Sequence, residues 1–336
     1  MDREVQEFLR EAGLVSAADD IICTALSGGI SCDVWRIDAG GRSICVKRAL
    51  PRLRVAALWE APVERSTHEW RWMQFAASVV PGSIPRLLAH DPARALLAME
   101  YLDPVAFPVW KQLLLQGEAS TETSGSVAAI LGRLHAISAG DAGIAAKFGT
   151  DDAFYALRIE PYLIEAARRN PRVAGVLQEL ARTTLGKHIA LVHGDVSPKN
   201  ILVGCSGPVF LDAETAWYGD PAFDLAFCLN HLLLKCLARP RWRDNYLACF
   251  GSFASRYLAS VSWEAPAELE RRTVLLLAAL LLARVDGKSP VEYLVERDRS
   301  FAREVACKWL AEPPPNLERL ARSWHAILSE REIRGG

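Results

Sequence analysis

The stretch LVHGDVSPKNILV, residues 191–203, decides the fold and points to the chemistry. Two short apolar segments enclose a histidine, an aspartate, a lysine and an asparagine, and a pair of buried strands does not need such residues for folding. Asn200 follows Asp195 by five residues, and Asp212 ends the strand-like segment VFLD twelve residues later. Two oxygen ligands and a separate carboxylate base on adjoining strand ends are what magnesium-dependent phosphoryl transfer requires.

The composition is that of a globular protein. The chain has 336 residues, of which 51% are hydrophobic and 24% charged, so it has ample material for a core. Its formal net charge is -1, so no global field attracts nucleic acid or an anionic membrane, and we expect neither as a partner.

Cysteine usage and hydropathy predict a soluble cytoplasmic protein. The eight cysteines are scattered singly, without a CxxC pair, and we interpret them as reduced. The opening MDREVQEFLREAG is charged and helical, unlike a secretory signal. The longest apolar run, VLLLAALLLA at 274–283, is too short to span a bilayer.

The pattern of apolar residues divides the chain into two parts. Residues 1–102 predict a small lobe of short strands, with a hairpin turn at 39–41 and a helix over about 63–78, in which Trp70, Met73 and Ala77 lie at helical intervals. Residues 103–336 predict a larger, helical lobe. The expected hinge is 100–103. In the second part only LVHGD, NILV and PVFLDAE read as strands.

HGDVSPKN has the register of the protein-kinase catalytic loop and, together with LDAETAWYGDPAFDLA, resembles the aminoglycoside phosphotransferase and choline kinase family. The resemblance covers nearly the whole chain. It implies an α+β, two-lobed protein-kinase-like fold. The small antiparallel-sheet N-lobe with one helix, residues 1–102, would bind the nucleotide, and the larger, mainly helical C-lobe, residues 103–336, would carry the catalytic loop and the acceptor site. It also implies that ATP, or less favourably GTP, donates its γ-phosphoryl group, with Mg²⁺, to a hydroxyl of a small molecule.

The resemblance assigns roles to the residues of this pattern. Asp195 would accept the hydroxyl proton, and Asn200 and Asp212 would hold Mg²⁺. Lys47 lies in the middle of the apolar strand ICVKRA, where a buried lysine needs an anionic partner. Lys47 would hold the nucleotide phosphates and pair with Glu69 of the following helix, with Glu64 as the second choice.

Two further segments would complete the nucleotide site. Ser27, Gly28, Gly29 and Ser31 stand between the first two strands, where glycines permit close approach of backbone N–H groups to phosphate oxygens. In the resemblance, the backbone groups of Glu100 and Leu102 would bind the adenine edge.

Departures from protein kinases favour a small-molecule acceptor. Gly194 stands where protein kinases have an arginine that can pair with a phosphorylated activation loop. The segment 212–224 is too short to contain a long activation segment. Asp224 reads mainly as a helix cap, although the resemblance adds that it braces the catalytic loop. His193 reads as a scaffold residue, and Glu214 as a solvated turn carboxylate rather than a group that touches metal through water.

The acceptor itself stays open. Residues 231–336 hold 17 Lys and Arg against 13 Asp and Glu, which argues mildly against a polycationic aminoglycoside. Arg284, Asp286 and Lys288 face the acceptor cleft in one interpretation; in the favoured one this segment is a turn with a helix cap at Ser289 and Pro290. Large aromatics usually belong to the core, and an aromatic wall is the alternative for three of them: Trp217, Tyr218 and Trp242.

Two other functions compete with phosphotransfer. A nucleotide-binding pseudokinase or regulatory module would keep the fold without the reaction, although all the polar parts are intact. A metal-assisted hydrolase would use His193 and Asp195 as ligands, but the seven histidines are dispersed. Aminoglycosides, choline-like amino alcohols, methylthioribose-like sugars and homoserine-like amino acids all remain open as acceptors, and the oligomeric state is not readable from the sequence.

Overall fold

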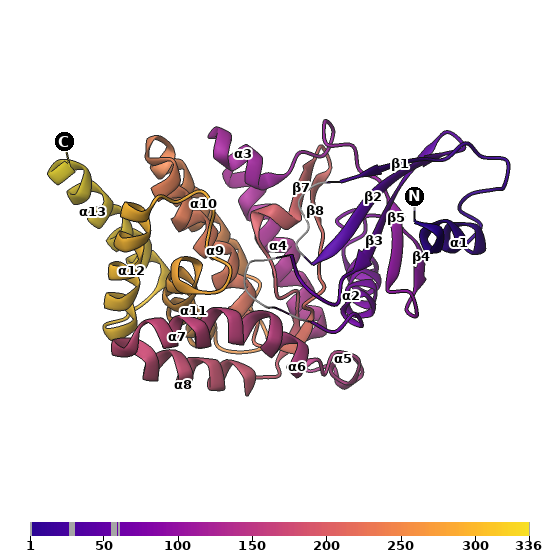
Figure 1. Ribbon diagram of the computed structural model, residues 1–336. Helices are drawn as coiled ribbons and strands as arrows, with labels where there is room; N and C mark the ends of the chain where they lie inside the picture. Colours follow the sequence, from indigo (N-terminus) through magenta and orange to yellow (C-terminus); the bar gives the residue numbers. More distant parts are fainter. Residues whose placement is uncertain (1, 27–30, 55–58, 60, 336) are drawn as a thin grey trace.

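An antiparallel sheet forms the first part of the chain (Figure 1). The computed structural model describes residues 2–26, 31–54, 59 and 61–335. Within these residues the sheet has five strands in the order β1-β2-β3-β5-β4. The strands are β1 (Ile22–Ala25), β2 (Cys32–Ala39), β3 (Arg42–Ala49), β4 (Leu87–Asp91) and β5 (Leu96–Glu100). Gly40 and Gly41 join β2 to β3 with φ of 55° and 75°, the left-handed geometry of a two-residue hairpin turn, within the turn predicted at 39–41.

The two faces of this sheet are covered by different helices. Helix α1 (Arg3–Glu11) packs against the face that carries Ile44 and Val46. Helix α2 (Arg65–Val79) packs against the opposite face, where the alternation of β3 places Cys45 and Lys47.

The predicted helix over 63–78 is therefore confirmed, but its buried stripe differs from the one expected. Trp72, Met73 and Ala76 are buried in the core, whereas Trp70 and Ala77 are half-buried beside it.

Helices dominate the rest of the chain (Figure 1). The longer ones are α3 (Trp110–Gln116), α4 (Thr121–Ser138), α8 (Ala174–Leu185), α9 (Pro221–Ala238), α10 (Arg243–Leu258), α11 (Pro266–Asp286), α12 (Glu296–Ala311) and α13 (Leu317–Gly335). Shorter ones are α5 (Ala142–Lys147), α6 (Asp151–Phe154) and α7 (Glu165–Arg169), and a π-helical segment, η1 (Tyr155–Ile164), joins α6 to α7. Single 3₁₀ turns are η2 (Pro171–Val173), η3 (Pro198–Asn200) and η4 (Pro240–Trp242).

Helix α9 forms the centre of the helical part, where α10 and α11 pack against it. It is long and apolar enough to cross a membrane by length and composition, but 94% of its apolar window is buried inside the protein. It is therefore accounted for as a core helix, because such helices are hydrophobic all round.

The described residues also form two small sheets of two strands each. Strand β6 (Ala190–Val192) pairs with β9 (Trp217–Gly219), and β7 (Ile201–Gly204) pairs with β8 (Gly207–Phe210), all antiparallel. Strand β9 was not predicted, because three residues carry too little periodicity. Strand β8 ends at Phe210, so Asp212 lies two residues beyond its end rather than at it.

The aromatic residues of this region belong mainly to the core. Trp217 and Tyr218 are buried, and Trp217 stacks on Phe154 with ring centroids 4.3 Å apart. Trp242 is partly buried against the same core. None of the three lines the cleft described below, so the interpretation as an aromatic wall is wrong.

Candidate active site

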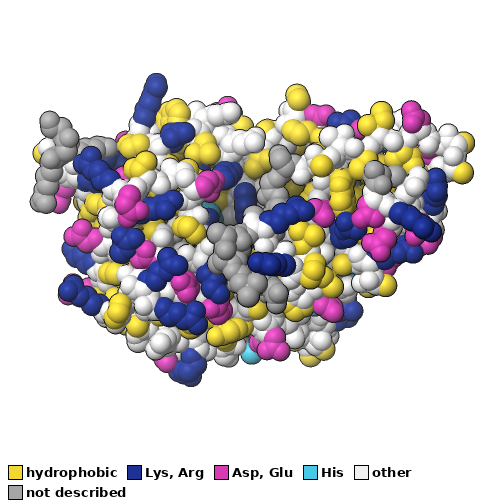
Figure 2. All heavy atoms as spheres, viewed as in Figure 1, with side chains coloured by type: hydrophobic (Ala, Val, Ile, Leu, Met, Phe, Trp, Pro, Cys, Tyr) yellow, Lys and Arg dark blue, Asp and Glu magenta, His cyan; other side chains and the backbone are white. Residues whose placement is uncertain are grey.

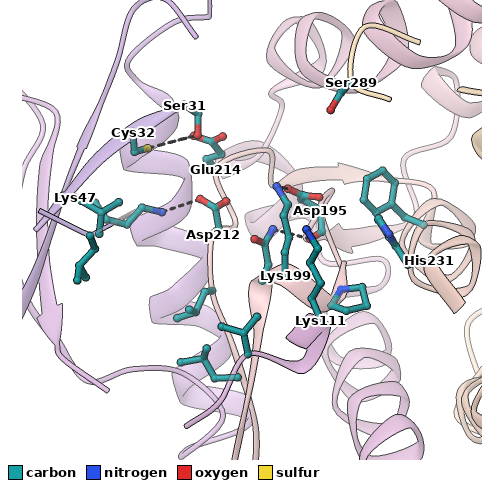
Figure 3. A pocket seen from close by; sticks show the side chains of 18 of the residues that line it. Ser31, Cys32, Lys47, Lys111, Asp195, Lys199, Asp212, Glu214, His231 and Ser289 are labelled. Atoms are coloured by element: carbon teal, nitrogen blue, oxygen red, sulfur yellow. Dashed lines mark hydrogen bonds and ion pairs between the residues drawn. The ribbon is translucent and has the colours of Figure 1, made fainter. Parts of the chain in front are cut away.

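A cleft of about 780 Å³ lies between the sheet and the helical part, and the predicted site residues that the structure describes, except Glu69, line it. Figure 2 shows the corresponding hollow, with Lys and Arg side chains at its rim. In Figure 3, Lys47 and Asp212 lie on one side, and Asp195, Lys199 and His231 on the other. The cleft therefore has two ends.

Lys47 forms the centre of the first end. Its Nζ lies 2.6 Å from Glu69 Oε1 and 2.8 Å from Asp212 Oδ1. Burial opposes the charge, but Asp212 and Glu69 outweigh it and raise the pKa of Lys47 well above its usual value. Burial raises the pKa of Glu69, and the charge of Asp212 adds to this rise, although Lys47 opposes it. Lys47 is thus a fixed cation, and Glu69 rather than Glu64 contacts it.

Arg65 and Glu214 form a second buried ion pair at this end. Arg65 Nε lies 2.9 Å from Glu214 Oε2, and the Arg65 side chain is 1% exposed. The expectation that Glu214 is a solvated carboxylate is wrong, because Glu214 is buried and satisfied by a guanidinium. The remaining Arg65 donors bind the backbone carbonyls of Ser31, Leu50, Ala61 and Pro62.

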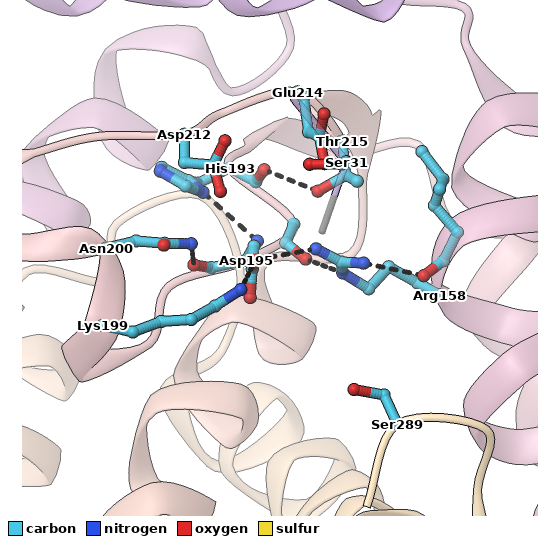
Figure 4. Close-up of polar contacts among 12 residues, drawn as sticks. Ser31, Arg158, His193, Asp195, Lys199, Asn200, Asp212, Glu214, Thr215 and Ser289 are labelled. Atoms are coloured by element: carbon cyan, nitrogen blue, oxygen red, sulfur yellow. Dashed lines mark hydrogen bonds and ion pairs between the residues drawn. The ribbon is translucent and has the colours of Figure 1, made fainter. Parts of the chain in front are cut away.

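Asp195 lies at the second end, between two cations. Arg158 Nη2 is 3.0 Å and Lys199 Nζ 3.2 Å from Asp195 Oδ2, as Figure 4 shows. Burial raises the pKa of Asp195, but Lys199 and Arg158 outweigh burial and hold this pKa below its usual value. Asp195 is therefore ionised at neutral pH and can accept a hydrogen bond from an alcohol.

Asp224 braces the loop that carries Asp195. Its carboxylate accepts hydrogen bonds from the backbone N–H groups of His193 (2.7 Å) and Gly194 (2.8 Å), and it also contacts His135 Nε2 at 3.2 Å. The cap of α9 is Asp220, which accepts from Ala222 N, so the interpretation of Asp224 as a cap is wrong.

His193 holds the same loop from its other side. Its Nδ1 accepts from Asp195 N at 3.2 Å, and its Nε2 donates to Leu211 O at 3.1 Å. Burial lowers the pKa of His193 although nearby carboxylates oppose this. These contacts describe a neutral imidazole that joins the loop to the segment before Asp212.

Gly194 is required by the backbone. Its φ is 76°, and a Cβ at this position would lie 2.5 Å from Thr215 O. A side chain here would therefore push the catalytic loop away from the segment that carries Asp212 and Glu214.

Asn200 and Asp212 offer oxygen atoms to a divalent cation. Asn200 Nδ2 donates to Asp195 O at 3.1 Å, which leaves the amide Oδ1 for another contact. Asp212 has a left-handed φ of 67° and a pKa held far below its usual value: burial raises this pKa, but Lys47 and Lys199 outweigh it. In the described residues no group of three or more His, Cys, Asp and Glu could hold a metal alone. One carboxylate and one amide fit Mg²⁺, which is commonly held by few protein ligands together with substrate phosphates.

The predicted nucleotide contacts fall partly outside the described residues. Ser27, Gly28 and Gly29 lie outside them. Ser31 lines the cleft, and its carbonyl accepts from Arg65 and from Leu50 N. Among the residues that line the cleft at the end of β5 are Met99, Glu100, Tyr101 and Leu102.

The predicted acceptor segment is only partly at the cleft. Arg284 lines it, whereas Asp286 pairs with Arg303 and Lys288 pairs with Glu160. The segment 287–295 contains bends and a turn, and α12 begins at Glu296 with Val295 as its cap. The favoured expectation of a cap at Ser289 and Pro290 is therefore wrong.

Several residues of the site were missed from the sequence. Lys199 stands inside the DVSPKN motif, four residues after Asp195. The spacing does not predict the 3₁₀ turn that brings its ammonium back to the Asp195 carboxylate. His231 and Lys235 are one helical turn apart in an apolar run, which is a signal for a shared polar face. No sequence pattern around Arg158 or Arg65 predicts that these arginines belong to the site.

Comparison with known proteins agrees with this geometry. Residues 22–269 match the model of a family described as the phosphotransferase enzyme family. A methylthioribose kinase of Bacillus mycoides is 23% identical over 280 residues, which cover 72% of this chain and 68% of that protein.

Solved structures agree in fold. A choline kinase of Cryptosporidium parvum has a TM-score of 0.55 at 14% identity, covering 98% of this chain and 99% of that one. A choline/ethanolamine kinase family protein of Mesorhizobium loti has a TM-score of 0.51 at 17% identity, covering 95% and 98%. The two-lobed protein-kinase-like fold expected from the sequence is thereby confirmed.

Proposed function

The chain belongs to the phosphotransferase enzyme family, and we propose from this that it transfers the γ-phosphoryl group of ATP to a hydroxyl group of a small molecule. The relatives include kinases of small molecules, and the coarse assignment as a small-molecule kinase follows from them. A cytoplasmic location, the division into lobes at residue 102, and the preference for ATP over GTP stay predictions.

One observation supports the reaction above all. A fixed cation, Lys47, lies in the same cleft as a buried and ionised carboxylate, Asp195, with the oxygen-bearing side chains Asn200 and Asp212 alongside (Figures 3 and 4). Phosphoryl transfer needs little covalent work from the protein and depends on positioning and on electrostatic stabilisation. These four residues can supply both.

The proposed step is an in-line displacement. The acceptor oxygen bonds to the γ-phosphorus, and the bond from that phosphorus to the bridging oxygen breaks, with its electron pair leaving on ADP. Asp195 holds the acceptor hydroxyl and takes its proton, which later passes to solvent. The low pKa of Asp195 suits a late proton transfer. Lys47 holds the phosphates of the nucleotide.

Asn200 and Asp212 would hold Mg²⁺, which when bound neutralises charge on the transferred phosphoryl group. Arg158 keeps Asp195 oriented from one side, and its Nε also donates to Gly194 O at 2.5 Å. The loop that carries Asp195 therefore has a cation fixed beside its carboxylate.

The test is an acceptor screen that measures ADP formation with Mg²⁺ and ATP, with Asp195→Asn as the blank and the exposed Asp152→Asn as the matched control. ADP formation that needs both an acceptor and Asp195 supports the proposal. Nucleotide binding without acceptor-dependent ADP formation in any panel favours a pseudokinase instead, and tight stoichiometric zinc in the purified protein favours a hydrolase.

A further inference from the structure

The acceptor end of the cleft is rich in cations. The basic side chains that line it there are Lys111, Arg158, Lys199, Lys235 and Arg284, and the acidic ones are Asp195 and Glu292. They come from α3, η1, η3, α9, α11 and the loop after α11, so separate parts of the fold bring positive charge to one place. Such a surplus in a partly closed cleft focuses a positive potential on whatever binds there.

Some of these cations have partners within the protein. Arg158 and Lys199 share Asp195, and Lys111 pairs with Glu292. Both carboxylates of this end are thus already in contact with cations, so neither is available as the partner of another one.

Lys235 and Arg284 are the exceptions among the described residues, and Arg284 Nη1 donates only to uncharged groups, Tyr162 OH and Ser289. Lys235 is 1% exposed, and no carboxylate of the described residues lies within ion-pair distance of its Nζ. Its ammonium lies 4.3 Å from the centroid of the Tyr293 ring, a cation–π contact that replaces only part of the lost hydration. Burial and the nearby Lys111 lower the pKa of Lys235 to about 7.

Other polar atoms around Lys235 also lack partners. Arg284 Nε and Tyr293 OH are buried and have no hydrogen-bond partner in the part of the chain that the structure describes, and both residues line the cleft. His231 lies one turn before Lys235 on α9 and also lines the cleft. Its pKa is far below the usual value because of burial and then of the surrounding cations, led by Arg284 and Lys235. Unpartnered buried donors of this kind call for an explanation by a ligand.

The nucleotide does not provide that explanation. Its phosphates have Lys47 at the opposite end of the cleft, and Figure 3 shows Lys47 well separated from Lys111, Lys199 and His231. The uncompensated charge therefore belongs to the part of the cleft in which the acceptor binds.

Building on the proposed function, we propose that the acceptor is an anionic alcohol, whose carboxylate or phosphate binds Lys235, Arg284 and Tyr293 while its hydroxyl meets Asp195. An anion there restores the missing charge and accepts hydrogen bonds from the ammonium, the guanidinium and the phenol. Choline-like and polycationic acceptors would instead add positive charge next to Lys235, and like charges in a desolvated site are strongly disfavoured.

The first test ranks acceptors by kcat/KM for ADP formation. Four panels are used at equal concentration: hydroxy acids, phosphorylated sugars and polyols, neutral sugars and polyols, and cationic amino alcohols. We expect the best anionic acceptor to exceed the best neutral or cationic one by at least about tenfold, and the leading panel distinguishes carboxylate from phosphate. A neutral or cationic acceptor at the top overturns this proposal and leaves phosphotransfer intact.

A variant locates the effect at Lys235. Lys235→Met removes the charge at nearly constant volume, and Lys308→Met, on the exposed side of α12, is the matched control. We expect the KM of the leading anionic acceptor to rise about tenfold or more, as for a lost hydrogen bond to a charged group. The KM for ATP is expected to stay within about twofold. An unchanged acceptor KM in Lys235→Met overturns the proposal.

Direct binding measurements test the proposal if no compound of the four panels is phosphorylated. Asp195→Asn with ADP and Mg²⁺ is titrated calorimetrically with glycerate, glycerol phosphate and choline. We expect one of the two anions to bind, and Lys235→Met to weaken that binding about tenfold or more. Binding of choline alone, or of neither anion, overturns the proposal. Anion binding in an enzyme that forms no ADP overturns the phosphotransfer function instead and keeps the anion site.

Discussion

The two ends of the cleft differ in how their charges are balanced. At the nucleotide end, Lys47 contacts Glu69 and Asp212, and Arg65 contacts Glu214. At the acceptor end, Lys235 is buried, and no carboxylate of the described part of the chain pairs with it. A balanced set of charges keeps its geometry by itself, whereas an unbalanced one is completed by a ligand. We therefore assign the shared reaction to the first end and propose that the second end selects the substrate.

The largest expected effect is on stability, when a cation is removed from the nucleotide end. We expect Arg65→Met to lower the free energy of unfolding by about 3–5 kcal/mol, because it leaves Glu214 buried with a charge and removes the Arg65 donors from the backbone carbonyls of Leu50, Ala61 and Pro62. Urea unfolding measures it, with the exposed Arg319→Met as control. A loss below about 1 kcal/mol would contradict the description of Arg65 as an essential partner.

The boundary between the two ends is tested at Asp195. Asp195→Asn is expected to lower kcat about a hundredfold or more, as for the loss of a general base. Nucleotide affinity should persist because Lys47 and its partners are unchanged. Single-turnover kinetics and nucleotide titration separate the two effects. Near-normal turnover would remove Asp195 from the role of base.

At the acceptor end, we expect the KM of an anionic acceptor to depend on pH. Lys235 has a pKa of about 7, below its ordinary value, so it loses its proton as the pH rises above 7. An anionic acceptor needs the protonated form, and its KM is expected to rise by up to about tenfold per pH unit above 7 until the pKa of the complex is reached.

The charged groups that face Lys235 are Lys111, Arg284, Arg239 and Glu292. The neighbouring imidazole of His231 stays neutral in this range, since its pKa is far below the usual value. Measuring KM from pH 6 to pH 9 checks the prediction, and Lys235→Met should flatten the profile. A pH-independent KM in the unmodified enzyme would count against the anionic acceptor.

The smallest expected effect has the opposite sign to that of Arg65. Lys235→Met is expected to raise the free energy of unfolding at pH 7 by about 1 kcal/mol, because an apolar side chain replaces an unpaired buried ammonium. The folded state lowers the pKa of Lys235, so the unfolded chain binds more protons between pH 7 and about 10, and the stability of the unmodified protein rises with pH there. The gain from methionine should therefore shrink toward alkaline pH. A lower free energy of unfolding for Lys235→Met would mean that the charge of Lys235 is balanced within the folded protein, contrary to the proposal.

Local pattern predicted what depends on neighbours in sequence. The apolar strand around Lys47 and the hairpin at 39–41 were predicted because strand composition and turn chemistry are local properties. The register of HGDVSPKN likewise indicated a loop that carries Asp195 and Asn200.

Pairings across the fold were not predictable in the same way. Glu214 has the same sequence neighbours whether it is solvated or paired with Arg65, 149 residues earlier. Asp224 sits in the first turn of α9, where a cap is the usual role, and only the tertiary approach of His193 and Gly194 turns it into a brace. The charge imbalance around Lys235 arises from α3, α9 and α11 together, and no single stretch of sequence contains it.

Helix α2 is attached at two points, since Glu69 holds Lys47 and Arg65, one turn earlier, holds Glu214 beyond the catalytic loop. Swinging this helix outward would break both ion pairs at once. We therefore expect an enzyme that stands ready at all times, without an on–off mechanism based on this helix, so that its output follows the supply of nucleotide and acceptor.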